Sequence, residues 1–535
     1  MPYNAKIFNW LFATGILVAL LQIWLPGYYL SCDGPCHLYN AKIVHDIWTN
    51  ENTALWSRFY KLIYTPDPNS TTTFVLAMLL FVAKGAVAEK IFLSSYVLIS
   101  AIGFYLLISN VSSKKSYWPL TVFIFIFTTA FAKGFYNFSL GTAFFYWMVW
   151  GWLRYMGKPS KGNAALFFLL SFFTFFSHLL PFVFGVITCA ALILSHTLAI
   201  DEVGNKQHKL KYFAQHSSTM AILLLPFLVL MFWFTDKHGG MQLHLSLHLY
   251  RLIELLEFKY IITLVKQEYV WALLTGILFC TLLAVTCIKG LRHYTVRKYD
   301  GFVLSLIAVG LIYLLVPEDF LGRTIIITIR AQIFVYIIVC CIIASRLQEG
   351  IEKNIGGLIV AALFLILSGY RMACMHKANT ALKGYLSATN YINNNAVVLA
   401  LDFSPNGKDA NGQQIATRNA IFHHAAQYMA ATKPLVILDN YEANMGYFPI
   451  RWRQEVNPYN HLSKRNGIEG IPPFAEIENY SKTTGVTIDN ILLWCYDSSC
   501  NKDADFAVLY KEIMHNYHRV YSDQYGNTLL YERNK

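Results

Sequence analysis

Two residues that follow the first apolar segment could act together in chemistry, Asp33 and His37. A carboxylate such as Asp33 could orient or deprotonate an acceptor hydroxyl, or hold a hard divalent cation such as Mg²⁺ or Mn²⁺. His37 follows four residues later, so a helix would place both side chains on one face. The alternative is structural: Asp33 or Gly34 caps a helix that has Pro35 in its first turn. Both roles are compatible, because a cap would fix the position of the carboxylate.

Cysteines lie on both sides of this acid, at Cys32 and Cys36, and a second pair, Cys495 and Cys500, brackets a turn-like sequence. In an oxidising compartment either pair could close a small disulfide loop, and free thiols are the alternative. The first pair with His37 also resembles a lengthened form of the C-x-x-C-H motif that attaches c-type haem. The extra residue departs from that motif and the sequence offers no evident axial partner, which argues against haem.

Three basic residues are candidates for binding a phosphate: Arg330, Arg323 and Lys133. The two arginines are seven residues apart, so two helical turns would bring them to similar faces. Arg330 enters an apolar segment, where a charge costs about 2.5–3.5 kcal/mol, and a bidentate clamp on a lipid phosphate would justify that cost. For Arg330 the alternative is snorkelling to the membrane interface, and for Lys133 it is an interface anchor.

Tight turns between apolar segments carry three further polar residues, Tyr136, Asn137 and His178. We expect these as possible substrate contacts, because they share a side of the membrane with the basic candidates in the topology derived below. The alternative for His178 is a hydrogen-bonded turn residue, since Pro181 follows closely.

The composition is that of a polytopic membrane protein. Of 535 residues, 56% are apolar and 14% are charged, whereas soluble domains carry about 25% charged residues. The formal charge of +12 comes mostly from short loops between apolar segments, and no basic, aromatic-interleaved module is present, so we expect no nucleic-acid partner. About 11 transmembrane helices are predicted at residues 7–26, 91–109, 117–132, 137–153, 163–178, 181–197, 217–235, 268–288, 301–316, 326–345 and 355–373.

The short apolar segment 71–83 decides the predicted topology. A span needs about 20 residues and rarely fewer than about 17, so we interpret this segment as a helix on the outer membrane surface. With a cytoplasmic N-terminus, the basic loops then face the cytoplasm, whereas counting the segment as a span would reverse them. The same parity places the candidate residues together on the outer side: Asp33, Lys133, His178, Arg323 and Arg330.

The sequence divides into a transmembrane domain, 1–373, whose first extracytoplasmic loop is 27–90, and an extracytoplasmic C-terminal domain, 374–535. The second part has a soluble composition and a usual domain size. Short Val/Ile/Leu-rich runs predict strands at 396–401, 435–438, 488–494 and 529–531, with helices at 420–431, 474–482 and 506–517. We therefore expect an α/β or α+β domain. Asp439-Asn440-Tyr441-Glu442 follows a strand end, a position suited to a ligand loop.

These features together resemble the GT-C superfamily of polytopic membrane glycosyltransferases. Residues 32–41 match the place and style of that family's acidic first-loop motif, and residues 65–69 with 71–83 resemble its proline-containing segment and surface helix. The resemblance implies inverting transfer of a sugar or glycan from a polyprenyl-phosphate or polyprenyl-diphosphate donor. Asp33 would be the base or the metal-positioning group, and Arg330, Arg323 and Lys133 would hold the phosphate. Gly34 stands where many members have a second acid.

The resemblance also implies a bacterial inner-membrane protein with a periplasmic C-terminal domain. Its partners would be the lipid-linked sugar donor, membrane lipids, and an acceptor that is a glycan, a lipid or a protein, and its cofactor, if any, would be a divalent cation such as Mg²⁺ or Mn²⁺. Two alternatives stay open. One is a transporter or flippase for lipid-linked glycans, although the sequence shows no clear repeat of the early spans in the later ones. The other is a non-catalytic envelope assembly protein of the same fold.

Overall fold

The computed structural model of the chain describes residues 3–200, 206–237, 245–291, 296–320, 323–324, 326–347, 351–462 and 467–535. Within these ranges, seven helices are long and apolar enough to cross a membrane. They are α1 (Ala5–Trp24), α5 (Ala86–Val111), α10 (Leu179–Leu198), α11 (Lys206–Lys237), α13 (Glu268–Leu291), α15 (Ile327–Arg346) and α16 (Ile351–Ser387). Each corresponds to a predicted span.

The other four predicted spans are not among these seven helices, although three of them are single helices. Helix α8 (Tyr136–Gly157) is long, and α9 (Lys161–Ser177) and α14 (Gly301–Leu315) are shorter apolar helices. The expectation of a continuous helix over 117–132 is wrong. The segment consists of a 3-10 turn η1 (Trp118–Thr121), α6 (Val122–Ile126) and α7 (Thr129–Ala132). The break lies at Thr128, which is extended and caps α7 by accepting a hydrogen bond from the Phe131 N–H, 3.2 Å away. The total of eleven spans stays a prediction.

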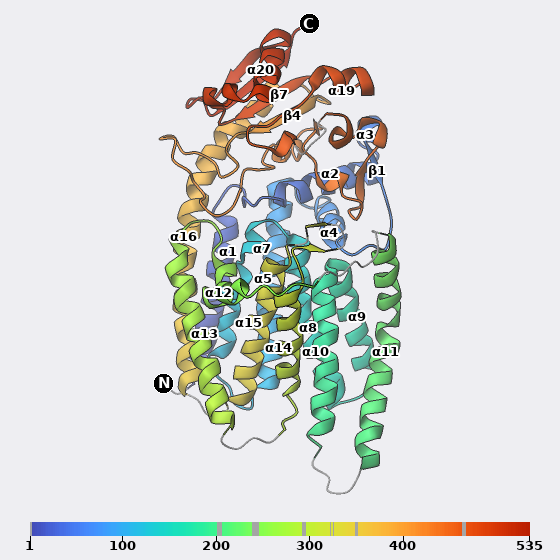
Figure 1. Cartoon of the computed structure of the whole chain (residues 1–535), viewed down its shortest axis with the longest axis vertical. Coiled ribbons are helices and arrows are strands. Elements are labelled where there is room, and N and C mark those ends of the chain that lie inside the picture. Colours follow the sequence, from blue (N-terminus) through green and yellow to red (C-terminus); the bar gives the residue numbers. More distant parts are fainter. Residues whose placement is uncertain are drawn as a thin grey trace.

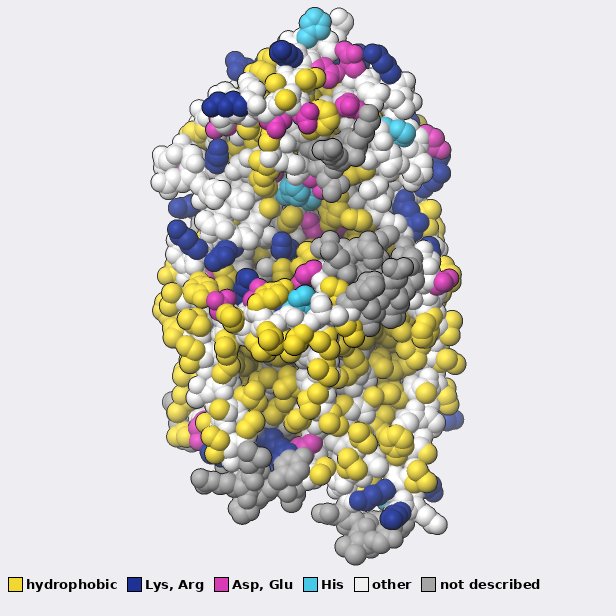
Figure 2. Space-filling model, viewed as in Figure 1, with side chains coloured by type: hydrophobic (Ala, Val, Ile, Leu, Met, Phe, Trp, Pro, Cys, Tyr) yellow, Lys and Arg dark blue, Asp and Glu magenta, His cyan; other side chains and the backbone are white. Residues whose placement is uncertain are grey.

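The long helices run side by side, and the C-terminal region covers one end of the bundle (Figure 1). On the face in Figure 2, charged side chains are spread over the upper half and recur at the lower end, and a mainly apolar band lies between them. Asp33 precedes α2, Lys133 follows α7, His178 precedes α10 and Arg330 lies in the first turn of α15, so each lies at the end of a helix, as the predicted topology requires. Which end faces the cytoplasm stays a prediction.

The first loop folds into short elements at the covered end. Helix α2 (Gly34–Thr49) begins with a proline in its first turn and ends before Asn50, whose backbone is left-handed at φ 58°. The predicted helix after Asp33 is therefore confirmed. It is followed by α3 (Thr53–Phe59), strand β1 (Tyr60–Leu62) and α4 (Thr71–Leu79). Helix α4 is shorter than the predicted segment 71–83, and it packs against α2 and α5.

The described part of the C-terminal region contains a five-stranded sheet in the order β5-β4-β7-β9-β8. Strands β5 (Val436–Ile437), β4 (Val397–Asp402) and β7 (Asn490–Trp494) are parallel, and β9 (Thr528–Arg533) pairs antiparallel with both β7 and β8 (Tyr517–Ser522). The same region also contains helices α19 (Ile477–Thr484) and α20 (Ala504–Asn516). The predicted mixed α/β architecture is confirmed, including four of its strands. The hairpin strand β8 was not predicted.

One predicted helix of this region is largely absent. Of residues 420–431, only α17 (Gln427–Ala430) is helical. Residues before it form successive turns, in which the Ala425 N–H donates to the Phe422 carbonyl at 2.9 Å and the Gln427 N–H donates to the His424 carbonyl at 3.0 Å. These turns place His424 beside the strand end that carries Asp439, which matters for the site below.

The C-terminal region is tied to the helices on both sides of the predicted boundary at 373/374. Helix α16 continues through that position without interruption to Ser387. Strand β1 of the first loop pairs antiparallel with β6 (Ile450–Trp452). At the base of the junction, the buried Arg371 guanidinium lies 3.2 Å from the Glu268 carboxylate. The first loop and the C-terminal region therefore pack as one layer over the covered end of the helices.

Candidate functional site

The segment containing Asp33 is held by the turn that follows α7. The Asp33 N–H donates to the Lys133 carbonyl at 3.0 Å, and the Cys32 N–H donates to the Ala132 carbonyl at 3.4 Å. Gly134 makes this approach possible. Its backbone has φ +82°, and a Cβ there would lie 2.5 Å from the Gly34 nitrogen and 2.6 Å from the Asp33 nitrogen. The turn that follows the broken 117–132 segment therefore contacts the backbone of Asp33 and places Lys133 beside it.

The Asp33 carboxylate is not used to cap α2. Asp33 occupies the N-cap position, as expected, but its side chain makes no cap hydrogen bond. The Gly34 N–H donates instead to the Ser31 hydroxyl at 3.2 Å. Asp33 is buried, with 8% of its surface exposed. A buried carboxylate without a capping duty can act on another group.

A histidine of the C-terminal region lies next to this carboxylate. Ligand atoms of Cys32, Asp33 and His424 all lie within 4.8 Å of one another. The other side of the His424 ring is fixed by Asp439, whose Oδ2 is 3.2 Å from Nδ1. Burial alone would lower the pKa of His424, but the Asp439 carboxylate outweighs it and raises the pKa to about 9. Burial, followed by the charge of Asp33, raises the pKa of the Cys32 thiol well above its usual value.

Further groups of the C-terminal region surround His424. The Tyr441 ring stacks on the imidazole with centroids 4.9 Å apart. The Glu469 carboxylate acts electrostatically on His424 and accepts a hydrogen bond from the Tyr459 hydroxyl at 2.6 Å. Burial raises the pKa of Glu469. The site therefore combines acids from both parts of the chain around one imidazole.

His37 is engaged on both ring nitrogens. Nδ1 lies 2.9 Å from the Glu442 carboxylate, and Nε2 lies 3.0 Å from the Gly134 carbonyl. The Nδ1 contact is an ion pair without hydrogen-bond geometry, whereas Nε2 faces the Gly134 carbonyl, which can only accept. Burial alone would lower the pKa of His37, yet Glu442 outweighs it and the pKa is raised. Glu442 also accepts from Asn40 Nδ2 at 2.8 Å. These contacts favour a positioning role for His37, between α2 and the C-terminal region.

Tyr136 and Asn137 also have protein partners. The Tyr136 hydroxyl donates to the buried Glu89 carboxylate at 2.8 Å, and Tyr428 reaches the same carboxylate at 3.1 Å. The Asn137 amide accepts from the Thr72 N–H at 2.9 Å and donates to the Asn69 carbonyl at 2.8 Å. Both side chains therefore join the first loop to α8, and their role as substrate contacts stays a prediction.

Arg330 lies in the first turn of α15, beside the site. Its guanidinium is 4.5 Å from the centroid of the Phe135 ring, and Asp33 and Tyr441 are among its electrostatic neighbours. His178 is near it: the histidine caps α10, with Nδ1 accepting from the Leu180 N–H at 3.1 Å. Burial, and then the charge of Arg330, lowers the pKa of His178 well below its usual value.

Arg323 is separated from this group in secondary structure. It lies in the two-residue strand β3 (Arg323–Thr324), paired with β2 (Asp319–Phe320), and not on the helix that contains Arg330. The expectation that both arginines share a helical face is therefore wrong. The Arg323 side chain lies outside the described part of the structure.

The donor set beside Asp33 bears on the choice of metal. Mg²⁺ and Mn²⁺ prefer oxygen ligands, whereas thiolate and imidazole suit softer cations. Within the described ranges, the group that could hold an ion consists of one sulfur, one carboxylate and one imidazole. The residues present therefore fit Mg²⁺ or Mn²⁺ poorly.

The residues singled out in the sequence did not include His424, Glu469 or Glu89. Asp439 and Glu442 lie in the strand-end loop noted above, so a position-based signal existed for them. His424 and Glu469 lie in stretches without a motif, and only the packing of the C-terminal region brings them to Asp33. Glu89 had one signal, an acid in the first turn of an apolar helix.

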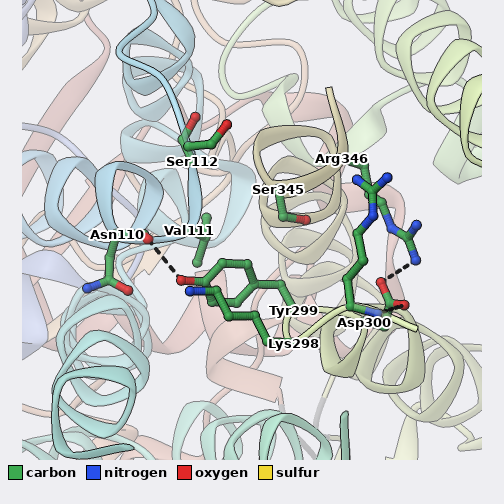
Figure 3. A pocket seen from close by; sticks show the side chains of 10 residues that line it. Asn110, Val111, Ser112, Lys298, Tyr299, Asp300, Ser345 and Arg346 are labelled. Atoms are coloured by element: carbon green, nitrogen blue, oxygen red, sulfur yellow. Dashed lines mark hydrogen bonds and ion pairs between the residues drawn. The ribbon is translucent and has the colours of Figure 1, made fainter. Parts of the chain in front are cut away.

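A separate polar pocket of about 290 Å³ lies at the opposite end of the helices (Figure 3). Within it Arg346 pairs with Asp300, and the Tyr299 hydroxyl donates to the Asn110 carbonyl at 3.1 Å. It is lined by Asn110, Val111, Ser112, Ser113, Arg297, Lys298, Tyr299, Asp300, Ser345 and Arg346. Since it joins the ends of α5, α14 and α15 that lie farthest from the C-terminal region, it is distinct from the Asp33 site.

No protein-family profile and no curated protein matches the sequence. Among solved structures, the fold is similar to the crystal structure of ArnT from Cupriavidus metallidurans bound to undecaprenyl phosphate. The two share 10% sequence identity over 99% of this chain and 98% of that chain, with a TM-score of 0.46. A likeness at this level assigns no role to any residue of the chain.

Proposed function

We propose that the chain is a membrane glycosyltransferase of the GT-C type, which moves a sugar or glycan from a polyprenyl-(di)phosphate donor to a hydroxyl acceptor. One observation supports this most directly. The Asp33 carboxylate, buried and without a capping role, lies in the electrostatic reach of Arg330 and next to Lys133. An acid and two cations at one end of a helical membrane bundle suit a reaction that activates a hydroxyl and releases a phosphate.

The donor would approach from between the helices with its phosphate at Arg330. A guanidinium offers two parallel N–H donors to a phosphate, and its aromatic contact with Phe135 holds it in place. Lys133 would add a second positive charge. Phosphate is already a good leaving group, so stabilising its charge contributes more than protonating it.

The acceptor hydroxyl would be oriented by Asp33 on the opposite face of the anomeric carbon. In a single displacement, the acceptor oxygen forms a bond to that carbon while the bond from the carbon to the phosphate oxygen breaks. The hydroxyl proton passes to the Asp33 carboxylate, and the phosphate leaves with the bonding electrons. One displacement of this kind inverts the anomeric configuration. His37 would hold α2 in register with the C-terminal region.

The C-terminal region would form the acceptor side of the site. His424, Tyr441 and Glu469 come from this region and surround Asp33. An acceptor entering over these residues would meet polar and aromatic side chains, which is the surface that a carbohydrate prefers. The outer side of a bacterial inner membrane is the location that we infer for this end.

The test is transfer of a labelled sugar from a polyprenyl-linked donor by the purified protein. Loss of a general base typically lowers the rate about 10²–10⁴-fold, and we expect Asp33→Asn to fall in that range. The matched control is Glu51→Gln, which removes an exposed carboxylate just beyond the other end of α2. Equal rates for Asp33→Asn and the control would overturn the assignment of Asp33.

A further inference from the structure

The adjacent residues Cys32 and Asp33 meet His424, which comes from a distant part of the sequence, and the proposed transfer step uses only the carboxylate of this group. The displacement needs a carboxylate on the acceptor side, but it gives no role to the Cys32 thiol and no chemical role to the His424 imidazole beyond lining the acceptor side. The ligand atoms of all three lie within 4.8 Å of one another. Asp33 and His424 are buried and Cys32 is half-buried, so the cluster is not a chance meeting of surface groups.

A second observation concerns the far side of the His424 ring. Histidines that bind a metal almost always donate their other ring N–H to a carboxylate or carbonyl, which fixes the tautomer and directs the free nitrogen at the metal. Asp439 Oδ2 lies 3.2 Å from His424 Nδ1 and supplies that partner. The other carboxylate oxygen, Oδ1, is buried without a hydrogen-bond partner. With Nδ1 facing Asp439, Nε2 is the His424 nitrogen that would bind a metal held by Cys32 and Asp33.

We infer that Cys32, Asp33 and His424 form a binding site for a borderline divalent cation such as Zn²⁺, in preference to Mg²⁺ or Mn²⁺. Sulfur, nitrogen and a carboxylate oxygen are the donors that Zn²⁺ takes. Three protein ligands leave one tetrahedral position open, as in sites where a metal meets a substrate. Asp439 acts as the outer partner that orients His424.

The charges around the cluster are compatible with a bound dication. Metal binding would displace the proton of the Cys32 thiol, and the resulting thiolate and the Asp33 carboxylate would together neutralise the dication. The site would also join the first loop to the C-terminal region, because two ligands precede α2 and the third lies between β4 and β5. Metal binding should therefore stabilise the assembled protein.

This inference deepens the proposed function, since it adds a cation to the acid that would meet the acceptor, but its test needs no donor. Full-length protein in detergent is stripped with a chelator and then titrated with ZnCl₂ or MgCl₂ alone. We expect one Zn²⁺ per chain by elemental analysis, a rise in melting temperature with Zn²⁺ and none with Mg²⁺. Titration with Co²⁺ should produce the charge-transfer absorption of a cobalt–thiolate bond.

Variants identify the ligands. Cys32→Ser should abolish the cobalt–thiolate absorption, and His424→Gln should remove tight Zn²⁺ binding. Asp439→Asn should weaken binding about 10–100-fold. The control Cys500→Ser, at a half-buried thiol whose electrostatic neighbours all lie in the C-terminal region, should bind as the wild type does.

Two results would overturn the inference. One is a stripped protein that takes up no Zn²⁺, and the other is a cobalt–thiolate absorption that survives in Cys32→Ser. Should a variant unfold, the wild-type preference for Zn²⁺ over Mg²⁺ in stoichiometry and melting temperature still decides. The proposed transfer can fail while the metal site stands, because binding is measured without a sugar donor.

Discussion

Removing the Glu442 carboxylate should loosen the C-terminal region from the helices. Glu442 is fully buried and forms two contacts with α2, an ion pair with His37 at 2.9 Å and a hydrogen bond from Asn40 at 2.8 Å. In Glu442→Gln, the amide oxygen can still accept from Asn40, so the change removes chiefly the ion pair. Breaking a buried pair by removing one partner costs about 3–5 kcal/mol.

The imidazole can lower this cost by releasing its proton, which places the expected loss near the bottom of that range, about 3 kcal/mol. For a cooperatively unfolding domain of about 150–250 residues, each 1 kcal/mol of lost stability lowers Tm by about 2–4 °C. Glu442→Gln should therefore melt about 6–12 °C below the wild type. The assay is tryptophan fluorescence on heating the purified protein in detergent.

A double-mutant cycle separates the pair from its surroundings. The double variant His37→Gln/Glu442→Gln should lose much less than the sum of the single losses, because the second change removes a partner that is already unpaired. The matched control is the exposed pair Lys482–Glu478, which lies 3.2 Å apart on α19 and should show no measurable coupling. The reasoning is refuted if Glu442→Gln melts with the wild type, or if the two losses simply add.

Three further predictions concern the same junction. The stability that His37 contributes should be complete below about pH 6.5, the pKa of the unfolded state, and should be lost as pH rises through its raised pKa in the folded state. The difference in Tm between wild type and His37→Gln should therefore shrink as pH rises, and a widening difference would contradict this. Tyr428→Phe removes a hydroxyl 3.1 Å from the buried Glu89 carboxylate and should lower the stability by about 1–3 kcal/mol in the same melting assay. An unchanged Tm would show that this hydrogen bond contributes no stability. Gly134→Ala should abolish transfer and lower the Tm, because its Cβ would meet backbone 2.5 Å away, whereas Gly157→Ala, with nothing within 4 Å, should leave both unchanged; equal behaviour of the two variants would contradict the close approach.

The sequence predicted those parts of the fold that depend on local composition. Long apolar segments marked the seven long helices, and Pro35 after an acid marked the start of α2. The short Val- and Leu-rich runs marked β4 and β7, which are buried along their length. In each case the burial of the segment follows from its own side chains.

The break at Thr128 could not be predicted in this way. Apart from Thr128 and Thr129, the residues from Val122 to Ala132 are all apolar, so the hydropathy pattern is that of one helix. The interruption is stabilised by contacts from elsewhere: the Thr129 hydroxyl donates to the carbonyls of Tyr260 and Ile262, at 2.7 and 3.0 Å. Such partners are invisible in a single segment.

The candidate site was predicted in part for the same reason. Asp33, Lys133 and Arg330 follow from parity, because each lies at the same end of a predicted span. The geometry assigns Tyr136 and Asn137 to the packing of the first loop, since their polar atoms meet Glu89 and Thr72. His424 lies almost four hundred residues from Asp33 in the sequence, and only the fold of the C-terminal region brings them together.

The central claim is that a lipid-linked phosphate binds at Arg330 with its sugar facing Asp33. A cryo-EM structure with a polyprenyl-phosphate sugar analogue tests it most directly. The account predicts phosphate oxygens at hydrogen-bonding distance from the Arg330 guanidinium, about 2.7–3.2 Å, and the anomeric carbon between that phosphate and the Asp33 carboxylate. A phosphate bound instead in the Asp300 pocket at the far end of the helices would contradict it.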